Sequence, residues 1–382
     1  MSSTLSSIRE SALPRLVDQA AGTPLLWLLG LSRRRRARPA APRRFGIMAF
    51  ETIGDTLLAA GTLLASLRAS LPGCEVVVFA SRGNYGSLAL LEGIAATVEV
   101  ALTNPWRAIA AIRSVPVDVM IDIGQWPRWY ALLCALSRSQ YTIGFATPGQ
   151  WRHYAYDSAV PHRDDVHELQ NFQRLLSPLA RIETFPPARA LKAPATPPQP
   201  IAAQLPYVVV HPWASGFRFA SREWPLERWR ELIARTCSLG FSVLVSGGPA
   251  DRGKAQALVA ACGSGLPVAS IAGEASLAEL AAVLHAAAAV VAVNTGVMHL
   301  AALLDAPLVA LHGPTSRLRW GPLGARSIAI APAASAGCEF LNLGFEYADR
   351  PVHCMEHIAV EEVFAALCSL LKQGPLSAPV CT

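Results

Sequence analysis

Residues 290–314, VVAVNTGVMHLAALLDAPLVALHGP, decide the fold that the sequence predicts. The β-branched run 290–293 is typical of a buried strand, and it ends at the turn 294–296. An apolar helical pattern follows, and 308–311 is a second strand-like run. Parallel sheets bind ligands beyond the carboxyl ends of their strands, and the N–H groups of a helix start can hold an anion. The unit therefore predicts a phosphate-binding turn, with a simple helix-capped turn as the alternative.

The rest of the chain alternates strand-like and helix-like segments at the spacing of βαβ units. This alternation predicts parallel sheets covered by helices on both faces, which is an α/β fold. A length of 382 residues suits two domains better than one core. We therefore predict two Rossmann-like domains facing each other across a cleft. The expected strands are 45–50, 75–80, 97–100, 117–123 and 141–145, then 207–211, 241–246, 268–271, 290–293 and 308–311.

Composition sets the expected domain boundaries. The chain is 52% hydrophobic and 16% charged, which is typical of a globular protein. Residues 185–206 are rich in proline, and this predicts a semi-extended linker. The linker separates a first domain, 44–184, from a second domain, 207–355. A basic and apolar leader, 1–43, precedes them, and a C-terminal helix and tail, 356–382, follows.

The leader combines an apolar run with a basic cluster. Seven arginines fall within residues 33–44, and the run 24–31 just before them contains Trp27. This pair of features is typical of a segment that binds an anionic membrane surface. The alternatives are a solvated tail whose apolar part packs on the protein, and a nucleic-acid contact. Nucleic acid is disfavoured because no aromatic residues are interleaved with the arginines.

No apolar run reaches the roughly 18 residues that span a bilayer, and we find no signal peptide. The eight cysteines form no C-x-x-C pair and show no zinc spacing. Most of them lie in apolar patterns, where a free cysteine behaves as a small hydrophobe. We therefore expect a protein of the reducing cytosol, bound peripherally to the inner face of the cytoplasmic membrane.

Two candidate sites follow predicted strands. Asp55 stands at the start of a helix, where its carboxylate could cap the helix or act as a base at the mouth of a crevice. The second is the loop 211–225, in which Arg218 and Arg222 could clamp a diphosphate and Ser215 could hydrogen-bond to it. A solvated loop is the alternative there.

Asp251 and the turn at Asn294, Thr295 and Gly296 complete the candidates. Asp251 follows two glycines after a strand, so it could cap the next helix or bind ribose hydroxyls. His299 lies one helical turn after the phosphate-binding turn and could reach a phosphate. A buried histidine with its partners inside the protein explains the same position equally well.

Absent motifs narrow the chemistry. The sequence has neither G-x-x-x-x-G-K-[ST] nor G-x-G-x-x-G, which argues against a P-loop NTPase and a typical NAD enzyme. It also lacks a D-x-D loop after a strand, so a metal-held diphosphate is not supported. The polar cluster at 162–167 could hold a metal, but its place before a helix favours capping and solvation. We therefore expect neither a metal nor a cofactor.

Several separated motifs together resemble the heptosyltransferase family, whose members are lipopolysaccharide-core glycosyltransferases of GT-B fold that use ADP-heptose. The resemblance covers about residues 44–373. Its carriers are IGDTLLAAGTLLASLR (53–68), DVMIDIG (118–124), HPWAS (211–215), REWPLERW (222–229), GGPADR (247–252) and NTGVMHLAALLDAPLVALHGPT (294–315).

The resemblance implies roles for individual residues. Asp55 matches the general base, and Arg222 matches the basic residue before Trp-Pro that binds the donor phosphates. Asp251 matches the acidic residue that holds the ribose. The element that cradles the diphosphate and the neighbouring sugar is carried by Thr295, Gly296 and His299.

Two positions depart from the family pattern: Asn294 stands where many members have Asp, and Arg222 where many have Lys. The expected function is an inverting, metal-independent transfer of heptose from ADP-heptose to a glycolipid such as the lipopolysaccharide core. One alternative is a non-catalytic nucleotide-sugar-binding or scaffolding protein at the membrane. Another is a protein O-heptosyltransferase, whose relatives carry a clustered cysteine iron site; here only Cys338 and Cys354 lie in that region.

Overall fold

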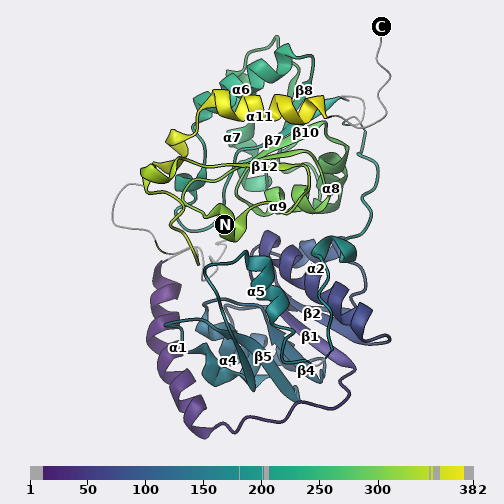
Figure 1. The fold of residues 1–382 in the computed structure, drawn as a ribbon, viewed down its shortest axis with the longest axis vertical. Coiled ribbons are helices and arrows are strands. Elements are labelled where there is room, and N and C mark those ends of the chain that lie inside the picture. The colour runs from purple at the N-terminus through teal and green to yellow at the C-terminus, as the bar shows by residue number, and fades with distance from the viewer. Residues whose placement is uncertain are drawn as a thin grey trace. The chain divides into compact units, whose positions relative to one another are not determined.

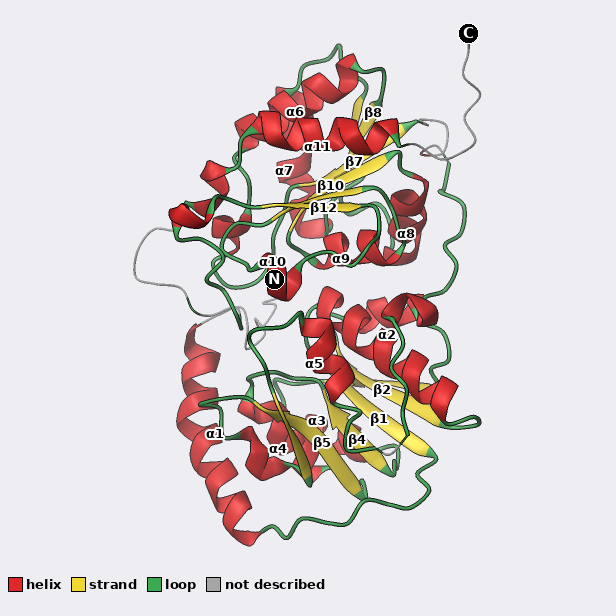
Figure 2. Cartoon of the chain, viewed as in Figure 1, coloured by secondary structure: helices red, strands yellow, loops and turns green. Residues whose placement is uncertain are grey.

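The computed structural model describes residues 12–179, 181–199, 201, 206–343, 346 and 353–373, with side chains from residue 15 onward. The chain forms two compact units that divide between Lys192 and Ala193. Each unit contains a six-stranded parallel sheet covered by helices (Figures 1 and 2). This confirms the prediction of two α/β domains.

The first sheet has the strand order β3-β2-β1-β4-β5-β6. Central strands such as β1 and β4 are buried almost throughout, as expected for apolar runs covered on both faces. The chain passes from β1 to β2 and β3, then returns to the other side of β1 at β4. The order therefore reverses between β1 and β4, where Met48 is the register partner of Asp122. The strands are β1 (Arg44–Ala49), β2 (Glu75–Ser81), β3 (Ala96–Val100), β4 (Val119–Asp122), β5 (Tyr141–Ala146) and β6 (Ser158–Pro161).

The helices of the first unit cover this sheet. Helix α2 is apolar on almost every side, and its residues from Gly54 to Leu67 are buried. Such a helix must be enclosed rather than lie at the surface. Its neighbours are α5 and η3. The elements are α1 (Ala12–Ser32), α2 (Ile53–Ser70), η1 (Tyr85–Leu90), α3 (Pro105–Arg113), α4 (Arg128–Leu136), η2 (Arg152–Ala155), α5 (Glu168–Arg174) and η3 (Pro187–Ala190).

Helix α1 revises the expected leader, because it packs along α4 and η2 of the first unit (Figure 1). Gly22 and Gly30 permit this close approach. A Cβ atom at Gly22 would lie 2.7 Å from the Cβ of Arg128, and one at Gly30 would lie 2.4 Å from Tyr154. Leu26 lies fully buried in the core beneath the helix. Among the helices of the described residues, none combines the length and apolarity needed to cross a bilayer.

The predicted linker 185–206 also needs correction at its start. The carbonyl of Phe185 accepts a hydrogen bond from Thr62 Oγ1 at 2.5 Å, and its N–H donates to Ser66 Oγ at 2.8 Å. The following 3-10 helix η3 packs against Gly61 on the same helix, α2. The first prolines therefore belong to the first unit, and the division into two units falls later, after Lys192.

The second sheet has the order β12-β11-β10-β7-β8-β9. Counted from β9 to β12, this strand order is the same as that of the first sheet counted from β3 to β6. In both sheets the first strand in sequence lies between the second and the fourth. The order reverses between β7 and β10, where His211 is the register partner of Ala292. The strands are β7 (Tyr207–His211), β8 (Ser242–Val245), β9 (Val268–Ser270), β10 (Ala289–Val293), β11 (Leu308–Leu311) and β12 (Ser327–Ile330).

The C-terminal helix α11 packs on the second unit, which the sequence did not specify. It contacts α6, and Val363 and Leu367 lie fully buried in the core of this unit. Just before it, the carbonyl of Ile358 accepts a hydrogen bond from Trp224 Nε1 at 3.0 Å. The helical elements are η5 (Phe219–Arg222), α6 (Leu226–Ser238), η6 (Pro249–Asp251), α7 (Arg252–Ala261), α8 (Leu277–Ala286), α9 (Gly296–Leu303), α10 (Arg317–Trp320), η7 (Ala334–Ala336), η8 (Cys354–His357) and α11 (Val360–Lys372).

Two features of the fold differ from the expectations drawn from the sequence. The edge strands β6 and β12 were not predicted, because both are short and only partly buried, so neither forms an apolar run. Cys338 and Cys354 form a disulfide, although the cysteine pattern had indicated a reducing compartment. The two cysteines are 16 residues apart in sequence, and only the return of the chain brings their Cα atoms to 5.8 Å.

Candidate active site

Asp55 lies in the first turn of α2, just beyond the carboxyl end of β1, where the strand order of the first sheet reverses. It is 4% exposed, and its carboxylate accepts a hydrogen bond from Thr52 Oγ1 at 3.0 Å. Thr52 Oγ1 in turn accepts from the Asp55 N–H at 3.4 Å, and the Thr52 N–H donates to the Asp55 carboxylate at 3.4 Å, so the two residues form a capping box. The structure thus gives Asp55 a capping role and also places its carboxylate where an open α/β sheet binds ligands.

Gln125 follows the neighbouring strand, β4, and was missed by the sequence analysis. Its side chain is fully buried, and neither amide atom has a hydrogen-bond partner among the described residues. Burying an amide without a partner is costly, so a ligand that bonds to it would recover that free energy. Its backbone carbonyl accepts from Thr147 Oγ1, which follows β5. No sequence motif marks this glutamine, because its significance lies in its burial.

A buried ion pair supports the end of β4. Arg152 Nη2 lies 2.6 Å from Asp122 Oδ2, and both side chains are fully buried. Tyr156 donates its hydroxyl proton to the same carboxylate oxygen at 2.7 Å. Burial alone would lower the pKa of Arg152, but Tyr156, Asp122 and Glu51 raise it overall. The guanidinium therefore stays charged and fixes the loop that carries Gln125.

In the second unit, the loop that follows β7 brings Ser215 and Arg222 together. Arg222 Nη2 donates to the backbone carbonyl of Ser215, which is itself exposed. Gly216, with φ 89°, and Arg218, with φ 48°, have left-handed backbones, and for arginine this conformation is uncommon. The loop therefore folds back on itself and holds the Arg222 guanidinium above its own backbone.

Asp251 lies beside the base of this loop, after β8. Its carboxylate accepts from the Gly248 N–H at 2.9 Å, at the N-cap of the short helix η6 that Asp251 itself ends. As the N-cap residue of the next helix, α7, it makes no side-chain cap hydrogen bond, so the capping expected there is not observed. Gly247 allows the close contact, since a Cβ there would lie 2.9 Å from both Asp251 Cβ and Trp213 Cδ1. Lys254 Nζ lies 5.4 Å from the centre of the Trp213 ring and adds a positive charge that the sequence analysis missed.

Asn294 and His299 gather around Trp320 after β10. The Asn294 amide donates to the Trp320 carbonyl at 3.2 Å, and its Nδ2 lies 3.4 Å from Nδ1 of His312. The rings of His299 and Trp320 face each other edge-on with centroids 6.5 Å apart. An ionised aspartate has no hydrogen to donate, so it could not make this bond to the Trp320 carbonyl. The amide of Asn294 can, and this is the physical difference between the two residues at this position.

Thr295 is the N-cap residue of α9, but its side chain makes no cap hydrogen bond. Its Oγ1 is buried and has no hydrogen-bond partner in the described part of the chain. The same holds for Oγ1 of Thr315, which follows β11. Two buried hydroxyls and the N–H groups at the start of α9 thus face the ends of neighbouring strands. These groups could all donate to an anion.

Burial also controls the charge at the end of β7. His211 is 7% exposed, and desolvation lowers its pKa from 6.5 to about 4. Its Nδ1 lies 2.9 Å from Oγ of Ser246 at the end of β8. His211 is therefore neutral at neutral pH, and arginine and lysine side chains such as Arg222 and Lys254 carry the positive charge of this region.

The polar segment 162–167 does not form a metal cluster. His162 Nε2 lies 2.9 Å from a carboxylate oxygen of Glu168, and His167 caps α5. Asp165 pairs with Arg163 at the surface. Within the described residues, no group of three or more His, Cys, Asp or Glu side chains could hold a metal ion.

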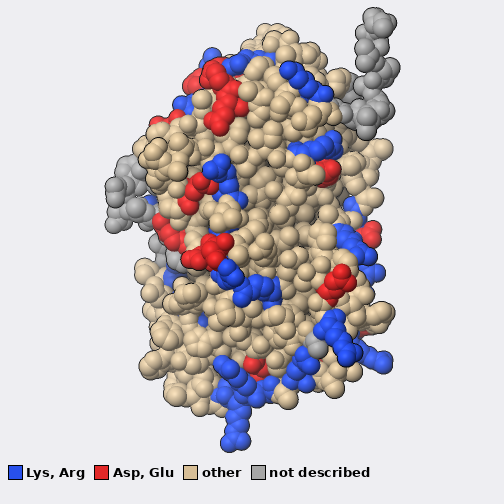
Figure 3. All heavy atoms as spheres, in the orientation of Figure 1, with Lys and Arg blue, Asp and Glu red and all other residues tan. Residues whose placement is uncertain are grey.

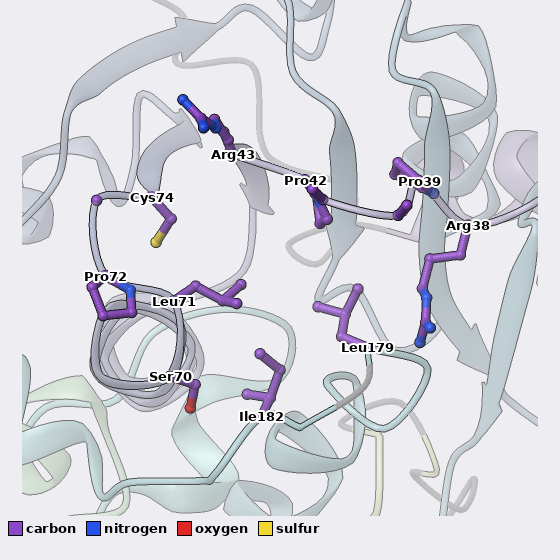
Figure 4. A pocket seen from close by; sticks show the side chains of 13 residues that line it. Arg38, Pro39, Pro42, Arg43, Ser70, Leu71, Pro72, Cys74, Leu179 and Ile182 are labelled. Carbon is purple, nitrogen blue, oxygen red and sulfur yellow. The ribbon is translucent and has the colours of Figure 1, made fainter.

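A cavity of about 560 Å³ in the first unit lies away from these residues (Figure 4). It is lined by Arg38, Arg43, Leu71, Cys74 and neighbouring residues, which precede β1 and β2 or follow α2. It therefore lies at the amino ends of the strands, whereas Asp55 and Gln125 lie at their carboxyl ends. Its lining contributes no group to the candidate site.

Two Rossmann-like units of the same strand order, each with polar residues where that order reverses, define a two-domain α/β protein of GT-B architecture. Residues 131–340, more than half of the chain, match the family model of glycosyltransferase family 9 (heptosyltransferase). The chain belongs to this family.

The chain is similar in sequence to known heptosyltransferases and similar in fold to solved ones. Lipopolysaccharide heptosyltransferase 1 of Pseudomonas aeruginosa is 44% identical over 112 residues, which cover 29% of this chain and 30% of that protein. The matched segment thus spans less than a third of that relative. The solved structure of E. coli ADP-heptose lps heptosyltransferase II has a TM-score of 0.69 at 18% identity, over 86% of this chain and 99% of that one. E. coli heptosyltransferase WaaC with ADP gives 0.66 at 18% identity, over 86% and 99%.

Proposed function

We propose that this protein is an inverting, metal-independent glycosyltransferase that transfers heptose from ADP-heptose to a glycolipid of the lipopolysaccharide-core type. The observation that carries the proposal is the turn after β10. There, the buried Thr295 hydroxyl lacks a partner among the described residues at the start of a helix whose N–H groups can bind phosphate. Family membership supports heptose as the sugar, and solved structures of E. coli heptosyltransferase WaaC contain ADP or ADP-2-deoxy-2-fluoro heptose.

In the proposed reaction, the acceptor hydroxyl oxygen attacks the anomeric carbon of the heptose while its proton passes to the Asp55 carboxylate. The bond between the anomeric carbon and the diphosphate oxygen breaks, and ADP leaves with the electron pair. Attack from the face opposite the diphosphate inverts the anomeric configuration.

Positive and polar groups of the second unit would stabilise the leaving diphosphate. We assign this role to Arg222, to Ser215 beside it, and to the N-terminus of α9 at Thr295 and Gly296. His299 would contact the phosphates or the neighbouring sugar, with Asn294 holding the loop of Trp320. Asp251 would bind the ribose through the carboxylate oxygen not used by Gly248. No step in this scheme requires a metal ion or a cofactor.

The acceptor determines where the enzyme works. A glycolipid lies in a membrane, so we propose that the protein acts peripherally at the cytoplasmic face of the cytoplasmic membrane. A nucleic-acid partner is not part of this proposal.

The direct test is ADP release from ADP-heptose with a heptose-free lipopolysaccharide precursor dispersed in detergent. We expect turnover that depends on both substrates and persists in EDTA. Activity that stops in EDTA and returns with Mg²⁺ or Mn²⁺ would refute metal independence. ADP-heptose should also raise the melting temperature more than UDP- or GDP-sugars do, because a ligand stabilises the state that it binds. Stabilisation without any turnover would favour a non-catalytic binding protein, and turnover only with a protein acceptor would favour an O-heptosyltransferase.

A further inference from the structure

The outer face of α1 is apolar from Leu16 to Leu31. Its exposed large side chains are Leu16, Val17, Leu25, Trp27, Leu28 and Leu31, and their exposed fractions range from 50% to 83%. At 100° per residue most of these side chains share the side of the helix opposite Asp18 and Leu26, which are buried against the first unit. We call the set Leu16, Val17, Trp27, Leu28 and Leu31 the α1 stripe.

Charge is excluded from the α1 stripe. Between Arg15 and Ser32 the only charged residues are Arg15 and Asp18, and neither is exposed. In Figure 3, the surface along α1 is almost free of acidic and basic side chains, while Lys or Arg side chains project below its lower end. A soluble helix that packs one face on a protein normally presents charges on the other. The stripe therefore requires a partner.

The arginines after α1 divide into two groups with different roles. Arg33 and Arg36 pair with the fully buried carboxylate of Asp157 at 3.1 and 2.7 Å, and this pairing attaches the segment to the first unit. Arg34 and Arg35 are exposed and have no hydrogen bond or ion pair within the described residues. Among the residues from Arg15 onward, the unpaired positive charge nearest the stripe thus lies at its C-terminal end.

We propose that the α1 stripe is the membrane-binding surface of this protein, with its apolar side chains inserted between the headgroups of an anionic bilayer and Arg34 and Arg35 at the phosphates. A helix with an apolar face and flanking basic residues lies in the plane of the interface, and tryptophan is favoured at that depth. The stripe lies on the outer surface of a single helix and forms no groove. Such a surface can be covered by lipid, because lipid needs no matching shape. This inference rests on the proposed function in one respect, namely that the acceptor is a glycolipid held in the membrane.

The test compares the full-length protein with a triple variant, Trp27→Ser, Leu28→Gln and Leu31→Gln, in co-sedimentation with vesicles of phosphatidylcholine and phosphatidylglycerol. We expect the triple variant to bind at least about 100-fold more weakly, since each side chain loses much of its burial free energy. The matched control is Trp106→Ser, Leu136→Gln and Leu239→Gln, which removes exposed apolar side chains elsewhere. The control should bind like the original protein.

Charge is tested separately with Arg34→Gln and Arg35→Gln. Their combined loss should weaken binding to anionic vesicles about 25-fold, because each basic residue near an anionic surface contributes about a factor of five. Pure phosphatidylcholine vesicles should not distinguish this variant from the original protein. Equal binding to the anionic vesicles would mean that these arginines lie away from the lipid.

Two results would overturn the proposal. One is unchanged vesicle binding by the triple variant. The other is a dimer in lipid-free solution that the triple variant converts to a monomer, which would make the stripe an interface between two copies of the chain. Activity on detergent-dispersed acceptor is measured in parallel. Its absence from every variant and from the original protein would count against the transferase and leave the vesicle result intact.

Discussion

The carboxylate of Asp18 on α1 accepts a hydrogen bond from the Trp129 N–H at 2.8 Å and thereby caps α4, a helix whose own N-cap residue is a proline. The same carboxylate accepts from the Arg128 N–H at 3.1 Å. A segment more than 100 residues away in sequence thus satisfies the first donors of α4. Helix α1 is therefore part of the first unit and not a detachable leader.

Asp18→Ala should lower the free energy of unfolding by about 0.5–2 kcal/mol, the usual effect of removing a helix cap. Urea denaturation measures this loss. Asp18→Asn retains one oxygen acceptor and should recover part of the stability, and Gln19→Ala on the exposed side serves as the control. A stability equal to that of the original protein would show that the cap contributes nothing.

Asp55→Asn should reduce turnover by about two to four orders of magnitude, the range expected when a general base is lost. Donor affinity should change little, because the role assigned to Asp55 concerns the acceptor. Asparagine can still accept the Thr52 hydrogen bond, so the capping box is largely preserved. Steady-state ADP release and donor titration measure the two effects. Near-normal turnover would remove Asp55 from the mechanism.

Arg222→Ala should weaken binding of ADP and ADP-heptose by about 1.5–3 kcal/mol, the cost of losing a charge-assisted hydrogen bond. Adenosine, which has no phosphates, should bind almost as before, and calorimetry can compare the ligands. Arg230→Ala is the matched control, since Arg230 pairs with Glu227 on the exposed side of the next helix. Equal losses for adenosine and ADP would indicate a role in the fold.

Thr295→Val separates binding from stability. Valine matches the shape of threonine and removes a buried hydroxyl that has no partner among the described residues, so the folded state should be as stable or slightly more stable. Binding of ADP should weaken, because one donor to the diphosphate is lost. Thermal melts with and without ADP measure both effects. A destabilised protein with normal ADP affinity would contradict the assignment.

His211 predicts a pH dependence of stability. Its folded pKa of about 4 lies below the unfolded value of 6.5, so between these values the unfolded chain binds a proton that the folded chain does not. Its contribution is fully present above about pH 6.5 and declines as the pH falls toward about 4, by about 3 kcal/mol in total. In urea denaturation over this range, His211→Gln should show a shallower decline than the original protein. Identical declines would mean that the pKa of His211 is the same in the folded and the unfolded chain.

Central strands were predictable because burial on both faces leaves an unbroken apolar run. The expected 308–311 matches β11, and 290–293 differs from β10 by one residue. From the sequence, only the apolar run 24–31 of helix α1 was noticed. Gly22 and Pro24 interrupt the helical pattern, and apolar residues on both faces of the helix hide its amphipathic spacing. The sequence could not show that Arg33 and Arg36 pair within the protein, because their partner Asp157 lies 124 and 121 residues later.

In the candidate site, too, some residues could be predicted from the sequence and others could not. Residues at strand ends, such as Asp55 and Thr295, could be found because a turn after a strand has a recognisable composition. Gln125 could not, since its value comes from complete burial and from partners that are missing, and neither is written in the local sequence. Long-range contacts also determine which arginines are available to a ligand or to lipid.

The attachment of α1 to the first unit has a consequence in time. During synthesis this helix emerges before the first sheet, whereas the Asp157 carboxylate that pairs with Arg33 is added 124 residues after that arginine. At about 5–20 residues per second, that interval lasts roughly 6–25 s. For most of it, the inner face of α1 lacks its partners α4 and η2, which begin at Arg128 and Arg152. If the α1 stripe binds lipid as proposed, the chain can reach the bilayer through this helix before the first unit has folded.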